Sequence, residues 1–127
     1  MRRLLKFVAL MAMVLVSFGA GAITAIVFHL GSPIVTVQLK NSSSQIISSV
    51  HLDHEHGSLT VTNIEPGDSR KVRFYSPGES SYKIKVVFAN GSTISGGAGY
   101  VESGYGVTEV ITDTVIASDF QLFSYVP

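Results

Sequence analysis

The feature that most constrains this chain is an uncharged, mainly apolar run of 22 residues from Phe7 to Phe28. As an α-helix rising about 1.5 Å per residue, the run is roughly 33 Å long, enough to cross a hydrocarbon core of about 30 Å. Three basic residues lie within the first six positions, and none follows the run before Lys40. Because basic flanks stay on the cytoplasmic side, the sequence predicts a cytoplasmic N-terminus and an extracytoplasmic remainder.

Two interpretations of this segment stay open, a retained signal anchor and a cleaved signal peptide. Ala20-Gly21-Ala22 has the small-x-small pattern of a signal peptidase site. The apolar sequence continues from Ile23 to Phe28, where a mature secreted chain usually becomes polar, so the anchor is favoured. The expected organisation is a basic cap over 1–6, a transmembrane anchor over 7–30, a linker over 31–33 and an extracytoplasmic domain over 34–127.

Charge and cysteine content exclude several classes of protein. Residues 1–33 carry three basic residues and no acid, and the remainder carries six basic and nine acidic residues. That remainder lacks the positive field that phosphate binding needs, so a nucleic-acid partner is not expected. The chain has no cysteine, which excludes a disulfide framework, a thiolate metal site and a thiol nucleophile.

After Pro33 the apolar residues alternate with polar ones in short segments, and turn residues separate these segments at intervals of roughly 8 to 12 residues. The expected strands cover 35–39, 46–52, 59–64, 70–75, 82–88, 93–94 and 105–113. We expect an all-β, antiparallel sandwich of about seven strands in which 70–75 and 82–88 form a hairpin. The apolar tail from Val115 to Pro127 is expected to pack on a sheet.

Part of this pattern resembles a known class of module. Asn41-Ser42-Ser43 follows a strand, and Ile64-Glu65-Pro66-Gly67-Asp68-Ser69 leads into Lys71-Val72-Arg73-Phe74. Over residues 34–90 the sequence resembles the immunoglobulin-like and fibronectin-type-III-like sandwiches of bacterial envelope proteins. The resemblance implies an immunoglobulin-like fold and a role in adhesion, spacing or partner binding.

The candidate metal site is a histidine-rich segment. It contains His51, His54 and His56, with Asp53 and Glu55 between them. Imidazole and carboxylate groups are ligands for zinc and copper. In an extended strand His54 and His56 share one face and His51 lies on the other, so three-histidine binding requires a bend. The alternative is a polar hairpin end that faces water.

The candidate partner contacts are Lys71, Arg73, Lys83, Lys85, Tyr100 and Tyr105. The four basic residues have the outward parity of two strands expected to be neighbours, which predicts one basic face for an acidic protein or acidic lipid headgroups. The alternative is that they keep an exposed sheet soluble. The two tyrosines lie in a glycine-rich segment and offer a large contact area at low entropic cost. Glu102, Glu109, Asp113 and Asp119 are expected to balance the basic face.

No catalytic or cofactor-binding pattern emerges from the sequence. The glycine-rich segment 96–106 lacks the lysine and the following helix of a phosphate-binding loop, and there is no nucleophile elbow. We therefore expect a non-enzymatic protein without a cofactor. It would be a single-pass membrane protein that presents a β-sandwich to an envelope protein partner. A histidine-based zinc or copper module and a secreted sandwich are the alternatives.

Overall fold

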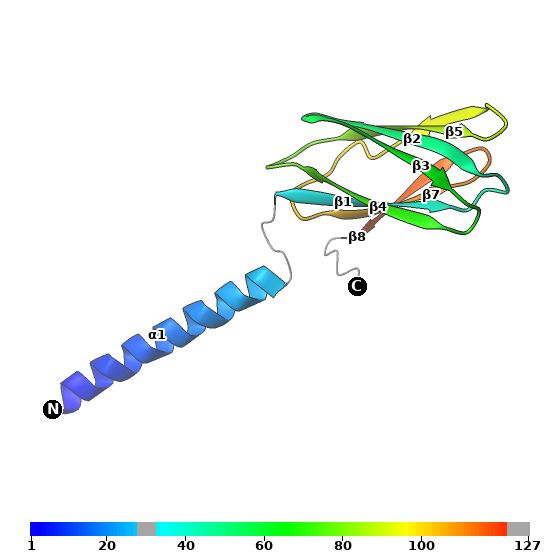
Figure 1. Ribbon diagram of the computed structural model, residues 1–127. Helices are drawn as coiled ribbons and strands as arrows, with labels where there is room; N and C mark the ends of the chain where they lie inside the picture. The colour runs from blue at the N-terminus through cyan, green and yellow to red at the C-terminus, as the bar shows by residue number, and fades with distance from the viewer. Residues whose placement is uncertain (28–32, 122–127) are drawn as a thin grey trace. The chain divides into compact units, whose positions relative to one another are not determined.

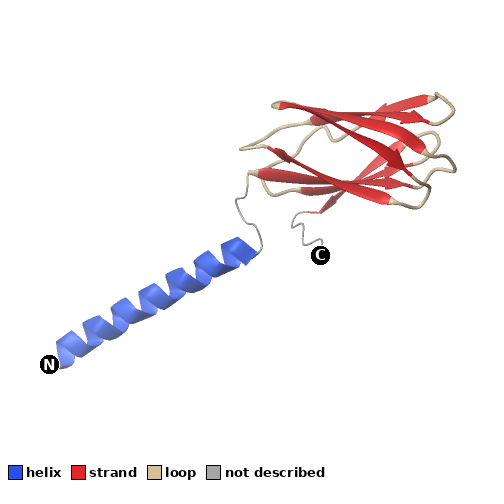
Figure 2. Ribbon diagram, viewed as in Figure 1, coloured by secondary structure: helices blue, strands red, loops and turns tan. Residues whose placement is uncertain are grey.

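The computed structural model describes residues 1–27 and 33–121. The chain divides into two compact units, Met1–Gly31 and Ser32–Pro127. The first is helical and the second is built of strands, as the colours of Figure 2 show. The predicted order, one apolar helix followed by a mostly β region, is confirmed.

The helical unit consists of α1 (Arg2–Val27). Its segment Arg3–Ile26 has a mean hydropathy of 2.2 and is long and apolar enough to cross a membrane, a property that signal sequences share. Two polar side chains within it are satisfied internally, because the hydroxyls of Ser17 and Thr24 each donate to a carbonyl four residues earlier at 2.9 Å. Such internal bonding makes a hydroxyl tolerable in a lipid environment.

Over residues 33–121 the second unit has eight strands in two four-stranded sheets. The strands are β1 (Ile34–Asn41), β2 (Ile47–His54), β3 (Gly57–Ile64), β4 (Ser69–Tyr75), β5 (Tyr82–Phe88), β6 (Thr93–Gly96), β7 (Gly106–Ile111) and β8 (Ile116–Gln121). Sheet 1 has the order β4-β1-β7-β8 and sheet 2 the order β3-β2-β5-β6 (Figure 1). β1 and β7 are parallel, and the other neighbouring strands are antiparallel.

The sequence predicted about seven strands, and the structure has eight. The additional strand, β8, lies in the apolar C-terminal tail and pairs with β7. The tail was expected to pack on a sheet, but as far as Gln121 it forms an edge strand of sheet 1 itself. Its remaining residues, 122–127, lie outside the described residues.

Side chains from both sheets form one apolar core. Val35, Val37 and Leu39 on β1 are completely buried. Ile84 and Val86 on β5 are at most 1% exposed. Their sequence neighbours on these strands are half-buried or exposed, as the two-residue period of a strand requires. The alternation in the sequence thus identified the core residues of these strands correctly.

The predicted hairpin of 70–75 with 82–88 is wrong. β4 is an edge strand of sheet 1 and pairs with β1, whereas β5 lies inside sheet 2 between β2 and β6. The intervening segment crosses between the sheets. The backbone of this segment forms hydrogen bonds with other parts of the β unit. The Ser76 N–H donates to the Pro33 carbonyl at 2.8 Å, and Ser80 and Val101 each donate to the carbonyl of the other at 2.9 and 2.8 Å.

One inward-facing position of β2 also differs from the prediction. Strict alternation in the strand predicted over 46–52 puts Ile46 on the same face as Val50, but Ile46 is 38% exposed and Ile47 is completely buried. The pairing of β2 with β5 shifts register between Ile47 and Ser49. A bulge adds one residue to a strand and so reverses the side-chain parity before it.

Asn41, in the turn motif noted in the sequence, is a buried structural residue. Its Nδ2 donates to the carbonyls of Gln45 at 2.9 Å and Ile64 at 2.8 Å, and its Oδ1 accepts from the N–H and hydroxyl of Ser43. The amide therefore holds the loop after β1 against the end of β3. Four hydrogen bonds compensate for the burial of this polar group.

The glycine-rich segment after β6 is explained by close packing. A Cβ at Gly96 would lie 2.9 Å from the Cβ of Ile116 on β8, where the edges of the two sheets approach. A Cβ at Gly97 would lie 2.5 Å from the Tyr82 carbonyl oxygen, and the φ angle of Gly97 is +120°. These glycines allow β6 and the following chain to approach β8 and β5.

We expect Gly97→Ala to destabilise the β unit by roughly 1–3 kcal/mol, because the new methyl group meets backbone and the φ angle disfavours any L side chain. Gly99→Ala is the matched control, since a Cβ there has no atom within 4 Å. Thermal unfolding of the two variants by circular dichroism measures the difference. Equal stability of both variants would contradict this account.

Candidate functional site

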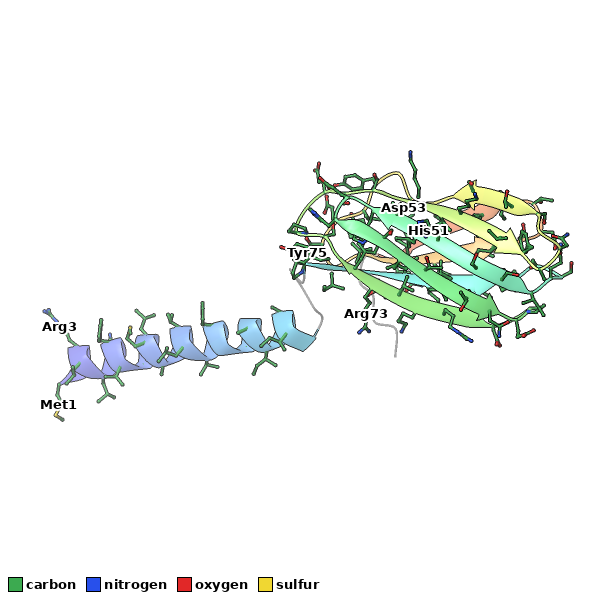
Figure 3. All side chains as sticks on the ribbon, turned by 45° about the horizontal axis from the view of Figure 1, so that its top comes forward. Met1, Arg3, His51, Asp53, Arg73 and Tyr75 are labelled. Atoms are coloured by element: carbon green, nitrogen blue, oxygen red, sulfur yellow. The ribbon has the colours of Figure 1, made fainter. Side chains whose placement is uncertain are left out.

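Three connections of the β unit gather at the end where the chain enters β1, and we call this the proximal end. The strand registers place Ile34 opposite Tyr75, and His54 opposite both Gly57 and Tyr82. The turn between β2 and β3, the segment between β4 and β5, and the segment between β6 and β7 therefore lie together. In Figure 3, Tyr75 marks this end.

An open depression of about 490 Å³ lies at the proximal end. It is lined by Asp53, His54, Glu55, Glu79, Ser80, Ser81, Tyr82, Lys83, Gly99 and Tyr100. Three carboxylates and one lysine make its lining acidic. The hydroxyl of Tyr100 donates to Glu102 and lies 3.5 Å from the Glu79 carboxylate, so the two loops that carry Tyr100 and Glu79 approach each other at the depression.

The three predicted metal-binding histidines point to different partners. His51 contacts Thr60 through Nδ1 at 2.9 Å and the Asp53 carboxylate through Nε2 at 3.1 Å. The His54 ring stacks on Phe74 with centroids 4.4 Å apart, and the His56 ring lies 5.8 Å from that of Tyr75.

Within residues 1–27 and 33–121 no group of three histidine or carboxylate side chains is placed to hold a metal ion. The structure therefore does not bring His51, His54 and His56 together. The bend that three-histidine binding requires is absent from the described strand, because β2 extends from Ile47 to His54 and keeps His51 on its outer face beside Asp53.

Partial burial lowers the pKa of His54 below its ordinary value of 6.5. The nearby His56 lowers the pKa further, and Asp53 opposes both effects. The backbone N–H of His56 also donates to His54 Nδ1 at 3.3 Å, a bond that the neutral ring accepts. Neutral His54 is thus the form that suits the stack on Phe74.

We expect NMR titration to give His54 a pKa below 6.5, with His56→Ala raising this pKa and Asp53→Asn lowering it. Because the pKa of His54 is lower in the folded state than in the unfolded state, neutral His54 favours the folded protein above pH 6.5. This contribution to the free energy of unfolding is lost as the pH falls through the folded-state pKa. A His54 pKa at or above 6.5, or unchanged by either substitution, would contradict this assignment.

The predicted single basic face does not exist. Lys71 and Arg73 lie on β4 in sheet 1, whereas Lys83 and Lys85 lie on β5 in sheet 2. Figure 3 shows Arg73 on one side of the β unit and the labelled residues of β2 on the other. The prediction failed because it assumed that the two strands were neighbours.

The other predicted contact residues, Tyr100 and Tyr105, do come together. Their ring centroids are 6.4 Å apart in an edge-to-face arrangement at the proximal end. Tyr105 packs partly against the core, and Tyr100 is 45% exposed. Tyr100 therefore offers accessible aromatic surface beside the acidic depression.

A buried carboxylate was not recognised from the sequence. Glu109 was expected among acidic residues that balance a basic face, yet it is completely buried in the core. The hydroxyl of Tyr82 donates to Glu109 Oε1 at 2.5 Å, and the Ser118 hydroxyl contacts both carboxylate oxygens at 2.8 and 3.0 Å. The Tyr82–Glu109 bond joins sheet 2 to sheet 1.

The sequence does contain a signal for this burial. Glu109 has the same strand parity as Val107 and Ile111, both of which are buried. Burial raises the pKa of the Tyr82 phenol above its ordinary value, and the bond and negative charge of Glu109 raise it further. The phenol thus stays protonated and donates.

We expect Tyr82→Phe to cost about 1–3 kcal/mol of unfolding free energy, because Glu109 then remains buried with one donor fewer. Tyr75→Phe, at a half-exposed tyrosine, is the control. The pKa of Tyr82 is higher in the folded state than its ordinary value of about 10. The free energy of unfolding of the wild type should therefore fall as the pH rises beyond about 10. Denaturant titrations at pH 8 and 11 test this, and a variant as alkali-sensitive as the wild type would contradict it.

Comparison with known proteins gives a fold-level likeness. No family model matches this sequence, and no curated protein matches it. The structure is similar to the NMR structure of a protein from Eubacterium rectale, with a TM-score of 0.58 and 11% identity. The match covers 76% of this chain, about the size of the β unit, and 97% of the other chain. At this identity the likeness shows a shared fold alone.

Proposed function

We propose that this protein is a single-pass membrane protein that presents the β unit on the extracytoplasmic side as a non-enzymatic module for an envelope protein partner. The observation that carries the proposal is the combination of α1, long and apolar enough to span a membrane, with a β unit that, within residues 33–121, builds an apolar core from its own two sheets. The apolar side chains of α1 are exposed and are therefore available for contact with lipid.

Chain length limits where such a partner would be found. Six residues separate Val27, the last residue of α1, from Ile34, the first of β1. Fully extended, they reach about 20 Å. A retained anchor would hold the β unit near the bilayer, so the proposed partner is itself a membrane or envelope component.

We assign the partner contact to the proximal end. Tyr100 supplies exposed aromatic surface there, and the depression beside it is acidic. Aromatic residues are enriched at protein interfaces, and charge complementarity favours a partner with basic side chains at this point. The basic residues of β4 and those of β5 lie on opposite sheets, and we propose them as two separate contact surfaces.

We also propose that the β unit belongs with the immunoglobulin-like sandwiches that its sequence resembles. Two features support this proposal. The two sheets pack on one core, and the chain passes between them at the β1–β2, β3–β4, β4–β5 and β6–β7 connections. Such exchange of strands between two sheets is typical of Greek-key sandwiches.

Cleavage after Ala22 would instead release a secreted β unit. The glycosylation acceptor sequences Asn41-Ser42-Ser43 and Asn90-Gly91-Ser92 both lie in the β unit and allow a test of topology. Translated with eukaryotic microsomes, the full chain should acquire a glycan at Asn90, resist carbonate extraction and keep Met1 in its intact mass. Asn90→Gln, at an exposed turn, is the matched control and should remove that glycan without releasing the protein.

The outcomes separate the alternatives. A carbonate-resistant chain without any glycan would place the β unit on the cytoplasmic side and overturn the proposed orientation. A glycosylated chain whose mass begins at Ile23 and which carbonate extracts would establish the secreted form and overturn the anchor.

A further inference from the structure

The four edge strands of the β unit differ in how they are protected from pairing with another chain. β4 carries Arg70, Lys71 and Arg73, β8 carries Asp119, and β6 is only four residues long. Charged side chains and short length are the usual devices that keep an edge strand unpaired. β3 has neither device, because it is eight residues long and includes no charge and no proline, and its left-handed residue, Asn63, lies beyond the regular segment Gly57–Thr62.

The hydrogen-bonding groups of β3 alternate between its partner strand and its open edge. His54 and Gly57 flank a two-residue turn and are therefore a hydrogen-bonded pair. Alternation along the antiparallel ladder then directs the backbone groups of Leu59 and Val61 toward β2. Those of Ser58, Thr60 and Thr62 point to the open edge of sheet 2.

The side chains of β3 are self-complementary about Thr60. In an antiparallel pair of two such strands centred on this residue, Thr60 lies opposite Thr60, Ser58 opposite Thr62, and Leu59 opposite Val61. Hydroxyls meet hydroxyls on the outer face, and aliphatic groups meet on the core face. Leu59 and Val61 pack against the core but are only half-buried, so a pairing strand would cover them further.

We propose that β3 is a self-association edge through which two copies of this chain pair antiparallel about a two-fold axis at Thr60, which extends sheet 2 from four strands to eight. Ser58, Thr60 and Thr62 direct their backbone groups to the open edge, and these are the residues of the two copies that the symmetry pairs by hydrogen bonds. An isologous pairing of this kind closes on itself and gives a dimer, not a filament. The proposal holds for an anchored or a released chain, so it does not depend on the proposed topology.

The neighbouring edge strand β4 adds an electrostatic signature. β4 borders β3 at the same edge of the β unit, and the Arg70 guanidinium reaches the Asn63 carbonyl at 3.5 Å. Pairing through β3 brings the basic β4 strands of both copies toward each other. Salt screens such repulsion between exposed charges, so dimerisation should increase with ionic strength.

Disulfide trapping tests the pairing and its register, because the chain has no cysteine of its own. Directly opposed residues of an antiparallel pair have Cα atoms about 4.5–5.5 Å apart, a separation that a disulfide spans. Under mild oxidation of the full chain, Thr60→Cys should form a covalent dimer, and more of it at high salt. Ser95→Cys, exposed on the opposite edge strand of the same sheet, is the matched control and should remain monomeric.

Two further variants report the register. Ser58→Cys and Thr62→Cys should each stay monomeric alone and should cross-link to each other when co-expressed, since the symmetry pairs position 58 with position 62. A Thr60→Cys chain that cross-links no more than Ser95→Cys would overturn the proposal. So would a Ser58→Cys homodimer as abundant as the Thr60→Cys dimer, or a Thr60→Cys adduct whose mass shows a different protein as the pairing strand.

Discussion

The stability of the β unit depends on the contact between the apolar faces of its two sheets. The chain has no cysteine, so no disulfide can supplement that contact. In the described part of the chain the core consists of aliphatic and aromatic side chains from both sheets, and one carboxylate, Glu109, lies among them. Hydroxyl groups from both sheets surround this carboxylate, which makes its burial tolerable and joins the sheets with a directional bond.

The same sheet contact explains features that otherwise look unrelated. Gly96 and Gly97 leave room for β8 and β5 where the sheets converge, and Asn41 ties a loop at the other end of the unit to β3. The segment after β4 crosses between the sheets and therefore forms part of the proximal end, beside the turn after β2. The depression and its acidic lining are thus a product of strand order.

How far the sequence predicts this structure depends on the range of each interaction. The apolar run identifies α1, and alternation identifies the strands and core residues such as Val37 and Ile84, because both patterns are local. Alternation gives the direction of a side chain but not the neighbour of its strand, and for this reason the basic face joining β4 and β5 was wrong. The donors of Glu109 come from Tyr82 and Ser118, 27 and 9 residues away, so charge alone suggested exposure.

The position of β1 has a mechanical consequence. β1 is the first strand after the helical unit, and it is hydrogen-bonded along its length to β4 on one side and to β7 on the other. When the β unit is held at the end opposite the start of β1, a pull on the chain before β1 is directed along this strand and loads both ladders in shear, so many hydrogen bonds must break together. An edge strand would have offered one ladder only. The β unit is therefore attached through an interior strand suited to bearing tension.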